Sequence, residues 1–220
     1  MPRWYDELTE PLAAHGLLPR GAFHPGPEDG VPGAPGTLVL AGNAGPGMWD
    51  AFAAARPDGA DPLDRWSRAV LGDIARRLGA VALFPFGGPP YLPFQRWAMR
   101  AEPVHSSPLG ILIHPDHGLW HGYRGALAFP DRLDLPPPDR RPSPCETCAG
   151  RPCLTTCPVG AFGKTGYDVG ACAMHLRTPA GADCMDEGCR ARRACPVGRD
   201  RIYPPAQAAF HMAAFLAARK

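Results

Sequence analysis

Eight cysteines between residues 145 and 195 are the residues of this chain whose type and spacing point most directly to chemistry. They form two sets of four, namely Cys145, Cys148, Cys153 and Cys157, then Cys172, Cys184, Cys189 and Cys195. Both sets end in Cys-Pro-Val-Gly, at Cys157–Gly160 and at Cys195–Gly198, so the segment is an imperfect internal repeat. Thiols in such a pattern can hold iron–sulfur clusters, bind zinc or form disulfides.

The doubled Cys-Pro motif resembles the ferredoxin module with two [4Fe–4S] clusters, over roughly residues 143–199. In that module the cysteine before proline ligates the cluster of the other half. The resemblance therefore implies a first cluster held by Cys145, Cys148, Cys153 and Cys195. It implies a second cluster held by Cys157, Cys172, Cys184 and Cys189.

The spacing is wider than in the standard module, with four residues between Cys148 and Cys153 and five between Cys189 and Cys195. Cys172 lies well before its partners and follows a Tyr167-Asp168 start. This wide lead is similar to the variant found in epoxyqueuosine reductase and related corrinoid iron–sulfur proteins.

Zinc sites and a disulfide framework are the alternatives for the eight thiols. Independent zinc knuckles need no ligand from the other half, so the doubled Cys-Pro disfavours them. Disulfide frameworks are typical of secreted chains. Residues 1–21 carry three acidic side chains and no apolar core of the length that a signal peptide needs. We therefore expect a cytoplasmic iron–sulfur protein.

Charge is distributed unevenly, although the net charge is only +2. Residues 1–139 carry a balance of −4 and residues 140–220 a balance of +6. Because a cluster with four thiolates is anionic, we expect the cations interleaved with the ligands to offset its charge: Arg151, Lys164, Arg190, Arg192 and Arg193. A nucleic-acid patch is the rival interpretation, which this interleaving disfavours. No apolar run reaches the ~20 residues of a membrane span.

The pattern of apolar residues, prolines and glycines predicts an α+β fold. We expect helices over 3–15 (interrupted at Pro11), over 46–55, from Asp61-Pro62 to a stop at Gly79, from Pro93 to residue 101, and from Pro204-Pro205. Short apolar runs predict strands over 36–41 and 80–84, and an antiparallel hairpin over 109–129. The expected domains are an α+β domain over 1–129, a proline-rich linker over 130–144, the cysteine module over 145–199 and a terminal helix over 200–220.

A second resemblance lies in the N-terminal region. Ile113-His114-Pro115, Gly118, Trp120 and Arg124-Gly125, with Phe23-His24-Pro25 and Asp61-Pro62 upstream, are similar to the cobalamin-processing protein of the cblC type. That family has a nitroreductase-like α+β fold and binds cobalamin. The resemblance, over roughly residues 20–140, implies a corrinoid pocket here.

Three residues are candidates to line this pocket. The resemblance carries over Arg124 as a polar contact to the ligand, and Gln95 on the helix before the hairpin. His121 alternates with Tyr123 on one strand face, which makes it a further candidate. Arg124 lies in an apolar run and needs a partner, which is either the ligand or a carboxylate such as Asp131 or Glu102. No catalytic constellation can be singled out from the sequence.

Three functions fit these patterns. The first is an oxidoreductase-type protein whose two clusters deliver electrons to a bound corrinoid. The second is a ferredoxin-like electron carrier whose N-terminal domain docks a partner. The third is an RNA-modifying reductase of the queuosine type, which ranks last because no basic stripe for RNA docking is evident. The expected partner in each case is an electron donor such as a flavodoxin, a ferredoxin or a flavin reductase.

Overall fold

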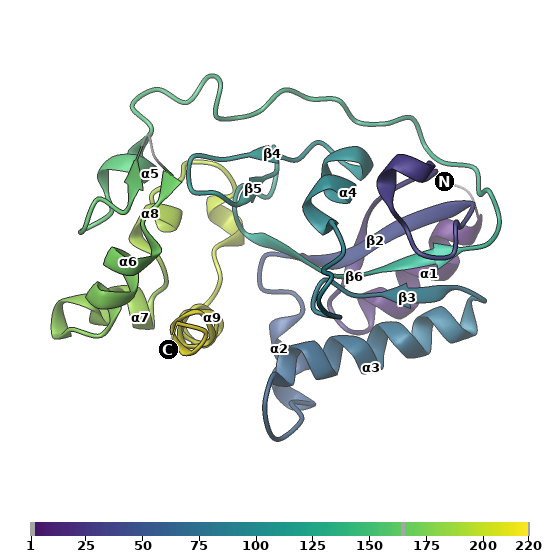
Figure 1. Ribbon diagram of the computed structural model, residues 1–220, viewed down its shortest axis with the longest axis horizontal. Helices are drawn as coiled ribbons and strands as arrows, with labels where there is room; N and C mark the ends of the chain where they lie inside the picture. The colour runs from purple at the N-terminus through teal and green to yellow at the C-terminus, as the bar shows by residue number, and fades with distance from the viewer. Residues whose placement is uncertain (1–2, 164–165, 220) are drawn as a thin grey trace. The chain divides into compact units, whose positions relative to one another are not determined.

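The computed structural model describes residues 3–163 and 166–219, and the chain forms two compact units (Figure 1). Unit 1 contains the described residues of Met1–Pro103 together with His121–Arg141. Unit 2 contains those of Val104–Trp120 and Pro142–Lys220. No helix in these residues is long and apolar enough to cross a membrane.

Unit 1 is built on a four-stranded antiparallel sheet in the order β1-β2-β6-β3. Its strands are β1 (Leu18–Phe23), β2 (Thr37–Ala44), β3 (Val81–Leu83) and β6 (His121–Phe129). Every residue of β2 is buried, as its run of small and aliphatic side chains predicts. The mixed α+β class is therefore as expected for this unit, whereas β1 was not predicted because Pro19 and Gly21 interrupt its apolar pattern.

Two irregularities in strand pairing place the two arginines of the sheet. The register between β1 and β2 shifts between Pro19 and Ala22, so Arg20 and Gly21 lie in a bulge. Between β2 and β6, Ala41 faces Gly125 while Gly42 faces Tyr123, which leaves Arg124 as the extra residue. A bulge redirects the side chain that it contains. The bulges therefore set the directions of both arginine side chains, which do not follow the regular alternation between the two faces of the sheet.

Helices cover both faces of the sheet, with α3 and α4 on opposite sides in Figure 1. The four helices are α1 (Arg3–Ala13), α2 (Trp49–Ala54), α3 (Pro62–Arg77) and α4 (Phe94–Ala101), with a 3-10 turn at Pro27–Asp29. The expected start of α3 at Pro62 and stop at Gly79, whose φ is +67°, are confirmed. Pro11 does not interrupt α1, which continues through it.

A buried ionic network ties α4 to the sheet of unit 1. The Arg20 side chain, 1% exposed, donates to Glu102 at 2.7 and 3.2 Å and to the Asn43 carbonyl at 2.7 Å. The Tyr123 hydroxyl also donates to Glu102, and His121 Nδ1 lies 3.2 Å from Arg20. Burial raises the pKa of Glu102 above its ordinary value of 4.5, although Arg20 and Tyr123 act in the opposite direction.

Unit 2 has little regular structure apart from its last helix. Two short pairs of strands, β4 (His105–Ser106) with β5 (Leu112–Ile113) and β7 (Phe162–Gly163) with β8 (Gly166–Tyr167), accompany the helices. The helices are α5 (Pro152–Thr155), α6 (Val169–Leu176), α7 (Ala182–Asp186), α8 (Arg190–Arg193) and α9 (Pro205–Ala217), with 3-10 turns at Pro179–Gly181 and Arg199–Arg201. The start of α9 at Pro205 is confirmed.

The expected hairpin over residues 109–129 is wrong. β5 pairs with β4, whereas β6 pairs with β2 and β3 of the other unit's sheet. The chain between them makes its own tight turn, with a bridge between His114 and Gly118. Leu109, Ile113 and Leu119 pack in one core cluster with Ala191 and Cys195, so this apolar segment belongs to the cysteine-rich unit.

The buried network yields a first prediction. Arg20→Leu should lower the free energy of unfolding by about 3–5 kcal/mol, because it leaves Glu102 buried without its cation. A raised carboxyl pKa gives stability that is complete below the ordinary value of 4.5 and lost as pH rises through the folded value. The deficit of the variant should therefore grow as pH rises above 4.5.

Urea denaturation followed by tryptophan fluorescence is suited to this test, because four of the five tryptophans (residues 4, 49, 66 and 97) lie in unit 1. Arg76→Leu is the control, since the Arg76–Asp73 ion pair is exposed and pairs of that kind contribute about 0–1 kcal/mol. Equal losses in the two variants, or a deficit independent of pH, would contradict the prediction.

Candidate metal centre

Short helices and turns of unit 2 carry the eight cysteines. We call Cys145, Cys148, Cys153 and Cys195 the first cysteine group, and Cys157, Cys172, Cys184 and Cys189 the second cysteine group. Cys153, Cys172 and Cys184 lie within α5, α6 and α7, whereas Cys189 immediately precedes α8. Cys157 and Cys195 follow α5 and α8, so each is delivered at the end of a one-turn helix.

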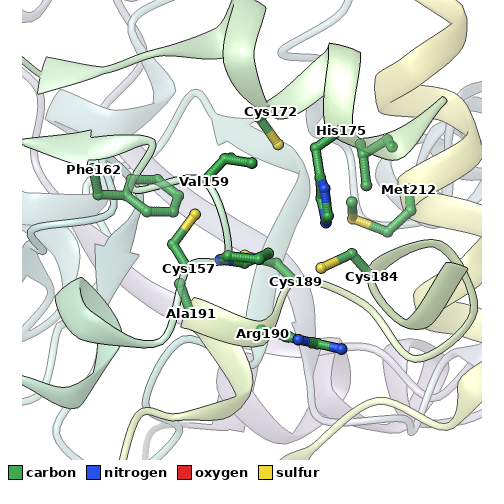
Figure 2. A pocket seen from close by; sticks show the side chains of 12 residues that line it. Cys157, Val159, Phe162, Cys172, His175, Cys184, Cys189, Arg190, Ala191 and Met212 are labelled. Atoms are coloured by element: carbon green, nitrogen blue, oxygen red, sulfur yellow. The ribbon is translucent and has the colours of Figure 1, made fainter. Parts of the chain in front are cut away.

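The second cysteine group lines one pocket (Figure 2). Its four thiols come from four separate stretches of chain, and the remaining wall is mainly apolar, with Val159, Phe162, Leu176 and Met212. The cavity is small, about 20 Å³, which is room for one water molecule. A larger group would therefore have to contact all four thiols and turn their side chains outward.

Three members of the first cysteine group belong to or pack against one apolar core, against which Cys157 and Cys189 of the second cysteine group also pack. Cys195 is 7% exposed and lies in the core cluster of Leu109, Ile113 and Leu119, against which Cys145 and Cys153 also pack. Burial raises the pKa of the Cys153 thiol, and the neighbouring Cys195, Cys145 and Cys148 raise it further. The structure thus places Cys145, Cys148 and Cys195 near Cys153, and the four thiols of the second cysteine group around one pocket.

Hydrogen-bond donors surround several of these sulfur atoms. In the second cysteine group, Ala161 N–H donates to Cys157 Sγ at 3.3 Å, the Tyr167 hydroxyl donates to Cys172, and the Ala191 and Arg192 N–H groups donate to Cys189. Burial raises the pKa of both Cys172 and Cys189, and these donors act against it. Donors of this kind stabilise a thiolate, the form that binds metal.

The repeated Cys-Pro-Val-Gly sequence forms a turn in both places. Gly160 and Gly198 have φ of +58° and +69°, in the left-handed region that favours glycine. In the second copy the backbone has no spare room, because a Cβ at Gly198 would overlap the backbone of His117 and Gly118. The turn after Cys195 is therefore packed directly against the turn at residues 114–118.

The arginines between Cys189 and Cys195 are held by partners in unit 2. Arg190 lines the pocket of the second cysteine group (below, the second pocket) and donates to Asp183 at 2.6 Å. Arg193 also donates to Asp183. Arg192 donates to the Leu119 carbonyl at 2.6 Å and lies 4.4 Å from the Trp120 ring centroid. Arg151 lies beside Cys145 in an open depression, and Lys164 falls outside the described residues.

One polar atom in the second pocket has no partner. His175 of α6 contributes to the pocket wall, and its Nε2 is buried without a hydrogen bond to any described residue. Met212 of α9 lines the same pocket. Sequence reasoning did not single out His175, and the only signal available was its position three residues after Cys172 on a helix, which puts the two on neighbouring faces.

The three candidate pocket residues of unit 1 do not come together. Arg124 donates to Asp64 at 2.6 Å and to Ser67 at 3.0 Å, both on α3, so the carboxylate that accepts from it there is Asp64. His121 lies near Arg20 in the network on the side of α4. Gln95 is exposed on α4. Their role toward a ligand stays a prediction.

Sequence reasoning also missed the apolar support of the first cysteine group. Leu109, Ile113 and Leu119 pack with Cys195 although they lie far from it in sequence. Their apolar run predicts a hairpin of the N-terminal domain, but an apolar pattern alone does not identify the core that a strand joins.

The comparisons with known proteins find likeness among solved structures. No family model matches the chain, and no curated protein matches it. Among solved structures the chain is similar to the epoxyqueuosine reductase from Streptococcus thermophilus, with a TM-score of 0.47 and 17% sequence identity. The likeness covers 79% of this chain and 53% of that chain, so this chain spans about half the length of the reductase structure.

The two repeat glycines give a second prediction. Gly160→Ala should cost about 1–2 kcal/mol, the strain of an L-residue in the left-handed region, because the space beside Gly160 is open. Gly198→Ala should cost more, since its Cβ also meets backbone that cannot rotate away. Thermal unfolding compares the two variants. Hydrogen exchange of the peptide covering 114–118 should rise only in Gly198→Ala, and equal exchange in both would contradict the packing argument.

Proposed function

We propose that the protein is an iron–sulfur redox protein whose unit 2 binds two [4Fe–4S] clusters and transfers single electrons. The observation that carries this proposal is the second cysteine group. Cys157 belongs in sequence to the first run of cysteines, yet it lines the pocket of Cys172, Cys184 and Cys189. The doubled Cys-Pro motif implies this arrangement, in which the cysteine before proline ligates the cluster of the other half.

The donor set of the second pocket fits such a cluster. Four thiols are the usual protein ligands of a [4Fe–4S] cluster, which supplies a one-electron redox couple when bound. Backbone N–H groups and the Tyr167 hydroxyl already point at three of the sulfur atoms. The hydrogen-bond donors and the mainly apolar wall are both features that tune the potential of a bound cluster.

Zinc is the metal that competes with iron–sulfur clusters as the group held by the eight thiols. A zinc ion needs its thiolates about 2.3 Å from a single point. The doubled Cys-Pro motif favours a cluster, because independent zinc knuckles need no ligand from the other half.

The electron acceptor separates the three functions that the sequence suggests. A corrinoid bound by unit 1 is the acceptor that the cblC-type resemblance implies, and a flavodoxin, ferredoxin or flavin reductase would be the donor. The pairing of Arg124 with Asp64 favours the plain electron carrier, because this cation already has its counterion. Titration with hydroxocobalamin separates these two functions, and a tRNA shift assay tests the RNA-modifying reductase.

Metal content is the direct test of the clusters. Protein purified without oxygen should contain about eight iron and eight sulfide per chain, the content of two cubes. Reduction with dithionite should give an EPR signal of a reduced cluster. Stoichiometric zinc without acid-labile sulfide would refute the proposal.

The exchange of ligands is a separate prediction. Cys157→Ala should halve the iron content and expose Cys172, Cys184 and Cys189 to alkylation in the native protein, because these three lose their cluster. Cys195→Ala should instead expose Cys145, Cys148 and Cys153. Mass spectrometry of the alkylated peptides reads out both patterns.

Thr156→Ala is the matched control for these substitutions, because Thr156 adjoins Cys157 but its hydroxyl bonds only to the exposed Pro152 carbonyl at 2.7 Å. This variant should keep all eight thiols protected. If Cys157→Ala exposes the first cysteine group, the assignment of ligands is wrong while the clusters themselves stand.

A further inference from the structure

His175 is the polar side chain in the second pocket that no hydrogen bond of the described chain accounts for. Its Nε2 atom is buried and has no partner, although its ring lines the pocket with the four thiols. A buried ring nitrogen without a hydrogen bond destabilises the fold, so such an atom in a native structure calls for a partner. Figure 2 shows the ring on the side of the pocket where Cys184 and Met212 also lie.

The donors to the other thiols leave one sulfur atom without a donor. Cys157, Cys172 and Cys189 each receive at least one N–H or O–H. Cys184 is 6% exposed, and none of the hydrogen bonds of the described chain ends on its sulfur. The pocket thus contains one unsatisfied ring nitrogen and one thiol that lacks a donor.

The chemistry of a ligated sulfur decides whether His175 Nε2 or the sulfur of Cys184 carries the proton between them. A thiol can donate its proton to an imidazole nitrogen, but a metal-bound thiolate and an inorganic sulfide can only accept. With the second cysteine group ligated, His175 Nε2 is satisfied only as a donor. This requirement places a proton on Nε2.

We propose that His175 is a positioning residue that donates Nε2–H to a sulfur atom on the Cys184 side of the cluster held by the second cysteine group. This inference rests on the proposed function, because it needs a cluster in that pocket. It assigns to His175 the tuning of the reduction potential. A donor to sulfur stabilises the reduced state, which carries one more negative charge, and therefore raises the potential.

The test measures potentials of anaerobically loaded, full-length protein. His175→Leu removes the donor and keeps an apolar side chain. It should lower the reduced-to-oxidised ratio of one cluster about tenfold at a fixed potential, the effect of one hydrogen bond to a charged acceptor. For a one-electron couple this is a shift of about 59 mV to more negative potential. Redox titration monitored by EPR records the shift.

Two further variants distinguish hydrogen bonding from packing. His175→Gln can present an amide N–H near the position of Nε2. Its reduction potential should therefore differ from that of the wild type by only a small fraction of the shift in His175→Leu. Met212→Leu changes the same pocket wall without touching a donor and should leave the potential unchanged. Pulsed EPR on protein labelled with [¹⁵N]histidine adds a direct readout, because the wild-type cluster should couple to a nitrogen that His175→Leu lacks.

Each outcome has one meaning. Wild-type protein without iron and sulfide overturns the proposed function, and the inference with it. If His175→Leu protein that contains both clusters keeps the wild-type reduction potential and the wild-type ¹⁵N coupling, only the inference is overturned. If His175→Leu loses half of its iron, retention by His175→Gln supports the donor role, whereas loss in both variants, or an equal shift in Met212→Leu, identifies a packing role and overturns it.

Discussion

The constraint on which unit 2 depends is that its thiols sit among apolar side chains. Burial raises the pKa of Cys145, Cys153, Cys172, Cys189 and Cys195, so the protein environment alone disfavours the thiolates. Helices of four or five residues, such as α5, α7 and α8, contribute little stability of their own. When metal binding converts buried thiols into ligated thiolates, its free energy becomes folding free energy. On the proposed function, the cysteine groups organise unit 2 as much as they serve it.

Sequence patterns predicted the elements whose signal is local. The Asp61-Pro62 start, the apolar spacing along α3 and the Gly79 stop belong to one short stretch of sequence, and the apolar run within β2 indicates a buried strand. The segment from Leu109 to Trp120 carries an equally clear apolar pattern, yet it joins the core of Cys195 and not the sheet of unit 1. Alternation predicts that a segment is half-buried, but the core that it joins depends on long-range packing that no local pattern encodes.

The candidate site divides in the same way. Cysteine spacing and the Cys-Pro repeat predict two groups of four thiols, and the structure places the thiols of the second cysteine group around one pocket. The atoms that surround the sulfurs were not predictable. They are backbone N–H groups of turns, such as Ala161, and side chains brought in by neighbouring elements, such as His175 and Met212. Their positions depend on turn geometry and on how helices pack, which the spacing of ligands does not determine.

Unit 1 shows why a buried arginine is weak evidence for a ligand. The bulge in β6 directs Arg124 toward α3, where Asp64 and Ser67 accept its hydrogen bonds, and the bulge in β1 directs Arg20 toward Glu102 near the end of α4. Each cation thus meets a carboxylate of its own unit, on opposite faces of one sheet. An anionic ligand at Arg124 would have to displace Asp64 and offset the lost ion pair before any gain in affinity. The need of Arg124 for a partner, the physical argument that singled it out in the sequence, is met within the fold, so a ligand contact there needs support from a binding measurement.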